Sequence, residues 1–247
     1  MAIPENILSI HSHEESIRES TIEAIEKEWY LLLDLSLIEK SMNLITHFIL
    51  QHENDEDGEK DILTIQRLGI RIFNGSASAL KLLLSGYYQT SALQQRDILE
   101  TIFLIDYLKT DKSQISKWSE SDEKARRKNY GPGKIRDALD ARDGHTDKKR
   151  NNAYKLLCNL AGHPTNDGFR MLTPEQGGDS HCGPYFGFNN MRATLEELAK
   201  EMIQAGSIFT LFFQVKTELD LATCKDFLNT GEEWREKLKK RPPVKQY

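Results

Sequence analysis

The residues best suited to chemistry in this sequence are an arginine and a glutamate on one helix and a histidine at the end of another. Arg96 and Glu100 are four residues apart and therefore share a helix face, inside a run that is otherwise apolar. His163 stands at the predicted end of a later helix, directly before Pro164, which stops that helix. Polar groups in such places cost stability unless they are paired, so these residues form either a structural network or a site.

Each of these residue types has a chemical use at its position. A guanidinium suits a phosphate or carboxylate, and Glu100 would then orient Arg96. The negative end of the helix dipole favours protonated His163, and a histidine that titrates near neutral pH can act as general acid or base. Asn159 lies four residues before His163, on the same helix face. The candidate catalytic residues are therefore His163, Arg96, Glu100 and Asn159. The alternative is that Arg96 and Glu100 form a buried ion pair, while His163 only caps its helix.

The charge of the chain is unevenly distributed. Residues 124–150 carry ten Lys/Arg against four Asp, whereas residues 1–61 carry fifteen Asp/Glu against four Lys/Arg. Clustered positive charge with Tyr130 in its midst suits RNA or another polyanion. The residues predicted to bind the nucleic acid are Arg126, Arg127, Lys128, Lys148, Lys149 and Arg150. The alternative is a solvated face, or a docking surface for the acidic N-terminal region.

Several other classes of function find no support in the sequence. Cys158, His163, His181 and Cys182 lack the spacing of a compact zinc site, and no P-loop, dinucleotide-binding glycine fingerprint or serine-hydrolase elbow is present. We therefore predict no metal and no cofactor. Three cysteines without a close pair argue against a disulfide framework. No signal peptide is visible and the apolar runs are too short for a bilayer, so we expect a cytoplasmic protein that does not enter the membrane.

Helical periodicity is typical of the segments that must position these residues, and the predicted fold class is all-α. Apolar residues recur at three and four over 14–51, which predicts a long N-terminal helix with at most one break. Further helices are predicted over 61–84, 92–109, 113–128, up to Arg142, 146–163 and 190–221. The Gly/Pro-rich segment 164–188 predicts an ordered loop or a short hairpin before the last long helix. We divide the chain into an N-terminal helical region (1–58), a helical core (59–222) and an exposed basic tail (223–247).

Three blocks of the sequence resemble a set of uncharacterised bacterial helical proteins. They are residues 91–100 (SALQQRDILE), 154–165 (YKLLCNLAGHPT) and 183–188 (GPYFGF). That set is similar to the HEPN superfamily, named for higher eukaryotes and prokaryotes nucleotide-binding, and the resemblance covers roughly residues 60–220. It implies a helical bundle, often from bacterial conflict systems, whose active members cut RNA without a metal and often pair their helices across a homodimer.

This sequence departs from the superfamily at one position that matters. The active HEPN ribonucleases resemble one another in an Arg shortly before the catalytic His. The positions before His163 hold Leu156, Leu157 and Cys158 instead. Arg96 would therefore have to take that role from another helix.

Two functions are consistent with these observations. In the first, the protein binds and cleaves RNA as a metal-independent toxin or defence protein: His163 moves the proton of a ribose hydroxyl, Arg96 stabilises the charge at phosphorus, and Glu100 and Asn159 position them. In the second, it is a non-enzymatic module that binds a partner or senses a nucleotide, with Arg96, Glu100 and His163 in a structural network. Catalysis requires Arg96 and His163 within reach of one substrate, whereas a structural network requires both to be buried and mutually satisfied.

Overall fold

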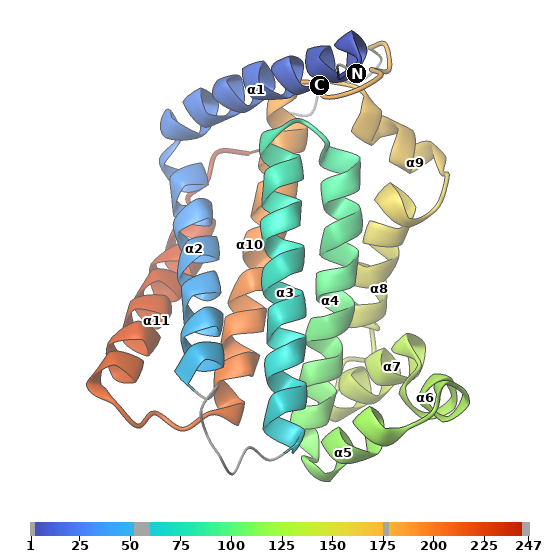
Figure 1. The fold of residues 1–247 in the computed structure, drawn as a ribbon, viewed down its shortest axis with the longest axis vertical. Helices are drawn as coiled ribbons and strands as arrows, with labels where there is room; N and C mark the ends of the chain where they lie inside the picture. The colour runs from blue at the N-terminus through green and yellow to red at the C-terminus, as the bar shows by residue number, and fades with distance from the viewer. Residues whose placement is uncertain (1–2, 52–59, 175–177, 244–247) are drawn as a thin grey trace.

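The computed structural model describes residues 3–51, 60–174 and 178–243, and within these ranges the protein contains helices and loops but no strand (Figure 1). The predicted all-α class is therefore confirmed. The helices are α1 (Glu5–Glu26), α2 (Trp29–Gln51), α3 (Lys60–Leu84), α4 (Tyr88–Thr110), α5 (Ser113–Glu120), α6 (Glu123–Tyr130), α7 (Pro132–Arg142), α8 (Lys149–Leu157), α9 (Asn166–Phe169), α10 (Phe188–Phe209) and α11 (Glu218–Leu238). A π-helical turn, Cys158–Gly162, follows α8.

The long helices α2, α3, α4, α10 and α11 run side by side, and α1 crosses one end of them (Figure 1). Helix α10 lies against α2, α3 and α4, while α11 packs on α2. The short helices α5, α6 and α7 gather at the opposite end, and α8 follows the outer side of α4 (Figure 1). The bundle thus presents α4 to the main core on one side and to α7 and α8 on the other.

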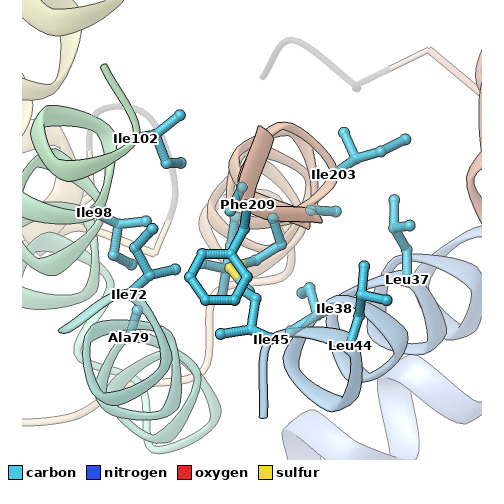
Figure 2. Packing of buried hydrophobic residues seen from close by; sticks show 14 of the residues in the cluster. Leu37, Ile38, Leu44, Ile45, Ile72, Ala79, Ile98, Ile102, Ile203 and Phe209 are labelled. Atoms are coloured by element: carbon cyan, nitrogen blue, oxygen red, sulfur yellow. The ribbon is translucent and has the colours of Figure 1, made fainter. Parts of the chain in front are cut away.

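The main core lies between α2, α3, α4 and α10. Phe209 of α10 stands in its middle, between Ile45 of α2 and Ile72 of α3 (Figure 2), and all three are almost completely buried. The small residues of α3 allow α4 to approach closely. A Cβ built on Gly75 would lie only 2.9 Å from Cγ1 of Ile98, so a larger residue there would force the two helices apart.

A second, smaller core fixes the outer helices. It joins α4 to α6, α7 and α8 through the buried residues Ala92, Leu99, Phe103, Tyr130, Ile135, Leu139 and Leu157. Burial of such side chains contributes about 1.5–3 kcal/mol each. This second core is what holds the candidate functional residues of α4 and α8 against each other.

Some helix boundaries differ from those predicted. The N-terminal helical pattern does break once, at Lys27 and Glu28. The helix predicted over 113–128 is also broken, because the Asp122 side chain accepts a hydrogen bond of 2.7 Å from the backbone N–H of Ala125 and starts α6 there. The segment 164–188 contains α9 and loop, with no strand among its described residues.

The prediction for the C-terminal region is wrong in two respects. The last core helix ends at Phe209 instead of 221, and a new helix, α11, begins after a capping box formed by Thr217 and Asp220. Residues from 223 onward are not an exposed tail over their described length, since Phe227, Trp234 and Arg241 are buried. Phe227 and Trp234 are seven residues apart and therefore share one face of α11. The charged residues around them hide this apolar pattern in the sequence.

The predicted domain boundary at 58 lies outside the described residues, and the one at 222 stays a prediction, although helices from all three predicted regions contribute to the main core. No helix among the described residues is long and apolar enough to cross a membrane.

Candidate functional site

Arg96 and Glu100 point from α4 toward α8, on one face as their spacing predicts. Arg96 Nε donates a hydrogen bond to Cys158 Sγ (3.2 Å), and Arg96 Nη2 lies 3.4 Å from Glu100 Oε1 and contacts the Tyr154 hydroxyl. The Arg96 side chain is 29% exposed and that of Glu100 is 24% exposed. The pair is therefore half-buried between two helices instead of sealed in the core.

Tyr154 is the centre of this cluster. Its ring lies beneath two guanidinium groups, with the Cζ atoms of Arg96 and Arg136 at 4.8 Å and 3.9 Å from the ring centroid. Burial and a hydrogen bond with Glu100 raise the pKa of Tyr154 to about 12. The hydroxyl consequently stays protonated at neutral pH and serves as a hydrogen-bonding group, not as a base.

The π-helical turn packs over Arg96 and ends at His163. The backbone N–H of His163 donates to the carbonyl of Cys158 (3.1 Å), which closes the turn, and the residue itself is extended. A Cβ built on Gly162 would lie 3.5 Å from Arg96 Cδ, so the turn passes directly over the stem of the arginine. Gln89 of α4 fixes the turn, since its side-chain amide donates to the carbonyl of Leu160 (3.1 Å). A π-helical turn of this kind is often found at functional sites.

The two candidate residues on this turn are solvent-accessible. The side chains of His163 and Asn159 are exposed, and neither makes a hydrogen bond with any residue that the structure describes. The structure therefore fits neither the catalytic site nor the structural network completely. Arg96 is paired with protein groups, as a structural network requires, whereas His163 is exposed, as catalysis requires.

The predicted nucleic-acid-binding residues fall into two groups. Arg126, Arg127 and Lys128 are exposed on α6, and Lys148 and Lys149 are exposed at the start of α8. An ion pair of 3.0 Å joins Arg127 to Glu123, but both side chains are about 80% exposed. Such a pair contributes little stability and leaves the arginine accessible.

Arg150 belongs to the other group. Its side chain is only 16% exposed and forms an ion pair with Asp140 (3.1 Å) and a closer one with Asp143. Asp106 lies 3.6 Å away and is also bound by Arg142. Arg150 thus links α8 to α4 and α7, and its charge is already balanced within the protein.

A cavity near these residues was not expected from the sequence. It has a volume of about 260 Å³ and lies between α3, α4, α5 and α7, where its walls include Glu100 and Arg136. In the sequence alone, Arg136 stands out only as one of the cations of the basic stretch 124–150. The helical spacing of Arg136 with Leu139 and Asp140, which are buried on the same side of α7, is the signal that would have found it.

The described residues contain no group of three or more His, Cys, Asp or Glu side chains placed to hold a metal ion. Cys158, Cys182 and Cys224 are free thiols. Comparison of the chain with models of protein families, with curated proteins and with solved structures found no match.

Proposed function

We propose that the protein binds single-stranded RNA along the exposed side of α8 and cleaves it, without a metal, at His163. The observation that carries the proposal is the position of the π-helical turn, which passes over the stem of the half-exposed Arg96 and ends at the exposed His163. These are the groups that a phosphodiester cleavage needs: one to move a proton and one to stabilise negative charge.

The exposed residues of α8 support RNA binding. Lys149, Asn152, Lys155 and Asn159 follow one another at three- and four-residue spacing and end at His163, and all are exposed. At 1.5 Å per residue, Lys149 lies about 20 Å from His163. The exposed cations of α6 lie at the same end of the bundle as the start of α8 (Figure 1) and would extend the positive surface. A strand of RNA a few nucleotides long would therefore reach from the basic end of α8 to His163.

The proposed reaction uses each residue once. His163 takes the proton of a ribose 2′-hydroxyl, whose oxygen forms a bond to the adjacent phosphorus while the bond from phosphorus to the 5′ oxygen breaks. The same proton is then given to the leaving 5′ oxygen, which yields a 2′,3′-cyclic phosphate and a free 5′-hydroxyl. Arg96 Nη1 makes no hydrogen bond with the described residues, so its two N–H groups are free to stabilise the charge at phosphorus. Glu100 orients Arg96, and Asn159 positions the RNA.

The proposal includes the finer expectations of the sequence. These are a cytoplasmic protein of the toxin or defence type and a homo-oligomer, in which two copies of His163 would line one cleft. Light scattering of the purified protein tests the oligomer, because a mass near that of one 28.4-kDa chain contradicts it.

A second candidate function is the non-enzymatic module. The observation that favours it is that Arg96 already contacts three protein groups, Cys158, Glu100 and Tyr154. In that case Arg96→Ala lowers the melting temperature, while His163→Ala changes neither stability nor any activity.

The experiment that tests cleavage uses a short single-stranded RNA, and the same RNA with one 2′-deoxy sugar, both in the presence of EDTA. We expect wild type to cut the RNA at the ribose but not at the deoxy sugar. His163→Ala should lose a factor of about 10²–10⁴ in rate and melt at the wild-type temperature, because it removes only the proton-transferring group. His11→Ala, which removes an exposed histidine from α1, is the matched control and should keep the activity. An intact wild type that binds RNA without cutting it excludes the ribonuclease, and equal cutting by His163→Ala excludes this site.

A further inference from the structure

Arg136 lacks the counter-ion that a buried arginine normally has. The residue is only 8% exposed, and its Nε and Nη1 atoms are completely buried without a hydrogen-bond partner. Its one described interaction is the stacking of the guanidinium on the ring of Tyr154, at 3.9 Å from the centroid. A buried guanidinium without an acceptor is costly, since the lost hydration of its N–H groups is not replaced.

The neighbouring charges are already paired with one another. Arg71 and Glu100 line the same cavity as Arg136. Arg71 binds Asp97 and the hydroxyl of Thr101, whereas Glu100 binds Arg96. Arg136 is therefore the unbalanced positive charge among the described residues of the cavity wall. Nη2 is the one guanidinium nitrogen of Arg136 that is neither fully buried nor hydrogen-bonded to a described residue, so its N–H groups remain for an acceptor that enters from the cavity.

The rest of the cavity wall is largely apolar and aromatic, with Phe103, Trp118, Tyr130 and Ile135 among its residues. The volume of the cavity is about 260 Å³. An engineered cavity of about 150 Å³ in another protein takes up benzene. The present cavity thus has room for one aromatic ring and a small polar substituent.

We propose that this cavity binds a small monocarboxylate with an aromatic body, whose carboxylate pairs with Arg136 and whose ring lies against Phe103 and Trp118. One unpaired guanidinium balances one negative charge. Asp97 and Glu100 stand in the same wall and would repel a second, which favours a carboxylate over a phosphate dianion. This binding site does not depend on the RNA-cleaving activity, although the two share Glu100 and Tyr154.

Benzoate and its neutral isostere benzamide test the proposal on the full-length protein. We expect millimolar benzoate to raise the melting temperature, while benzamide at the same concentration has little effect, because only benzoate supplies a charge for Arg136. In an NMR titration with ¹⁵N-labelled protein, benzoate should shift the indole N–H signal of Trp118 and leave those of Trp29 and Trp234 unchanged, since only Trp118 lines the cavity. The Trp118→Phe variant assigns that signal.

The matched variants are Arg136→Met, which removes the unpaired charge, and Arg170→Met, which removes an arginine that is 78% exposed. Benzoate affinity should fall tenfold or more in the first variant, as expected for the loss of a charge-assisted hydrogen bond, and stay unchanged in the second. Equal responses to benzoate and benzamide overturn the proposal, as does a phosphate response that matches the benzoate response. So does a benzoate titration of wild type in which no indole N–H signal moves, and this last result needs no variant to fold.

Discussion

Two buried arginines of this protein have opposite surroundings. The side chain of Arg241, just after α11, is 4% exposed and binds both oxygens of Asp34 on α2, with Nη1–Oδ2 and Nη2–Oδ1 distances of 2.9 and 2.7 Å. Arg136 on α7 is 8% exposed and has no carboxylate partner among the described residues. Burial alone therefore does not distinguish a structural arginine from a binding one. The presence of a counter-ion does, because a buried charge is tolerated only when something balances it.

The surroundings of Arg241 are built to hold it. Trp234 lies below its guanidinium at 5.3 Å and also donates a hydrogen bond of 2.6 Å to Asp34, and Glu196 of α10 lies 3.3 Å away. These residues join α2 to α10 and α11, which are distant from it in the sequence. Only the Nε atom of Arg241 is left without a partner. This cluster is a structural ion-pair network that holds α2, α10 and α11 together.

The largest expected effect comes from breaking that cluster. Arg241→Met should lower the free energy of unfolding by about 3–5 kcal/mol, because it leaves Asp34 buried and charged without its cationic partner. Urea denaturation measures the loss, and Lys240→Met, which changes an exposed neighbour, is the control. Burial already raises the pKa of Asp34, and the loss of Arg241 raises it further. The penalty should therefore grow with pH, and an equal penalty at pH 5 and pH 8 would contradict this explanation.

Sequence reasoning predicted the parts of this fold that depend on local spacing. The helical class and the shared face of Arg96 and Glu100 both follow from a period of 3.6 residues, which is a property of a short segment. The sequence allowed one break in the N-terminal helix but did not place it before Trp29.

The pairing of distant charges could not be predicted. Arg150 and Arg136 belong to the same basic stretch, yet three aspartates surround Arg150 and none is bound to Arg136. Arg241 belongs to a basic run that the sequence predicts to be exposed, but its partner, Asp34, is 207 residues away. Which cation is balanced depends on how α4, α7 and α8 pack, and that packing is set by tertiary contacts.

A medium effect on stability is expected at Asp220, a carboxylate that can be compared with Asp34. Burial alone would raise the pKa of Asp220, as it does for Asp34. Hydrogen bonds from His47 and from the backbone N–H groups of Lys216 and Thr217 instead hold that pKa well below its usual range. Because the folded pKa is lowered, this carboxylate stabilises the protein above about pH 4, and the contribution is lost as the pH falls further.

Asp220→Asn should therefore lower stability by about 2 kcal/mol at pH 7 and much less near pH 3. Urea denaturation at both pH values measures the difference. The exposed Asp226→Asn on the same helix serves as the control, because its partner Lys40 pairs with it at the surface. A loss of the same size at both pH values would mean that Asp220 acts through the geometry of its cap alone.

A smaller effect of the opposite sign is expected at Arg136. In the protein without ligand, Arg136→Met should raise the free energy of unfolding by about 1 kcal/mol, because the gain from removing unpaired buried donors exceeds the lost stacking on Tyr154. Together with Arg241→Met, the same substitution at two buried arginines should thus change stability in opposite directions. Urea denaturation of both variants in one buffer decides this, and destabilisation by both would make Arg136 a structural residue.

The smallest effect on stability is expected where the charge is fully exposed. Arg127→Gln breaks only a surface ion pair with Glu123 and should change the free energy of unfolding by less than about 0.5 kcal/mol. Its effect on RNA should be clear nevertheless. If Arg127 contacts a phosphate, affinity falls for every sequence, and the slope of log affinity against log salt decreases by about 0.7.

Arg150→Gln is the converse case, because it should lower stability by breaking the pairs with Asp140 and Asp143 while leaving the salt slope unchanged. Fluorescence anisotropy with a labelled single strand over a range of salt concentrations measures both variants. Equal slopes for wild type and Arg127→Gln would remove α6 from the RNA-binding surface. A reduced slope for Arg150→Gln would show that its charge acts on RNA in spite of its aspartates, and that a satisfied ion pair does not exclude a role in binding.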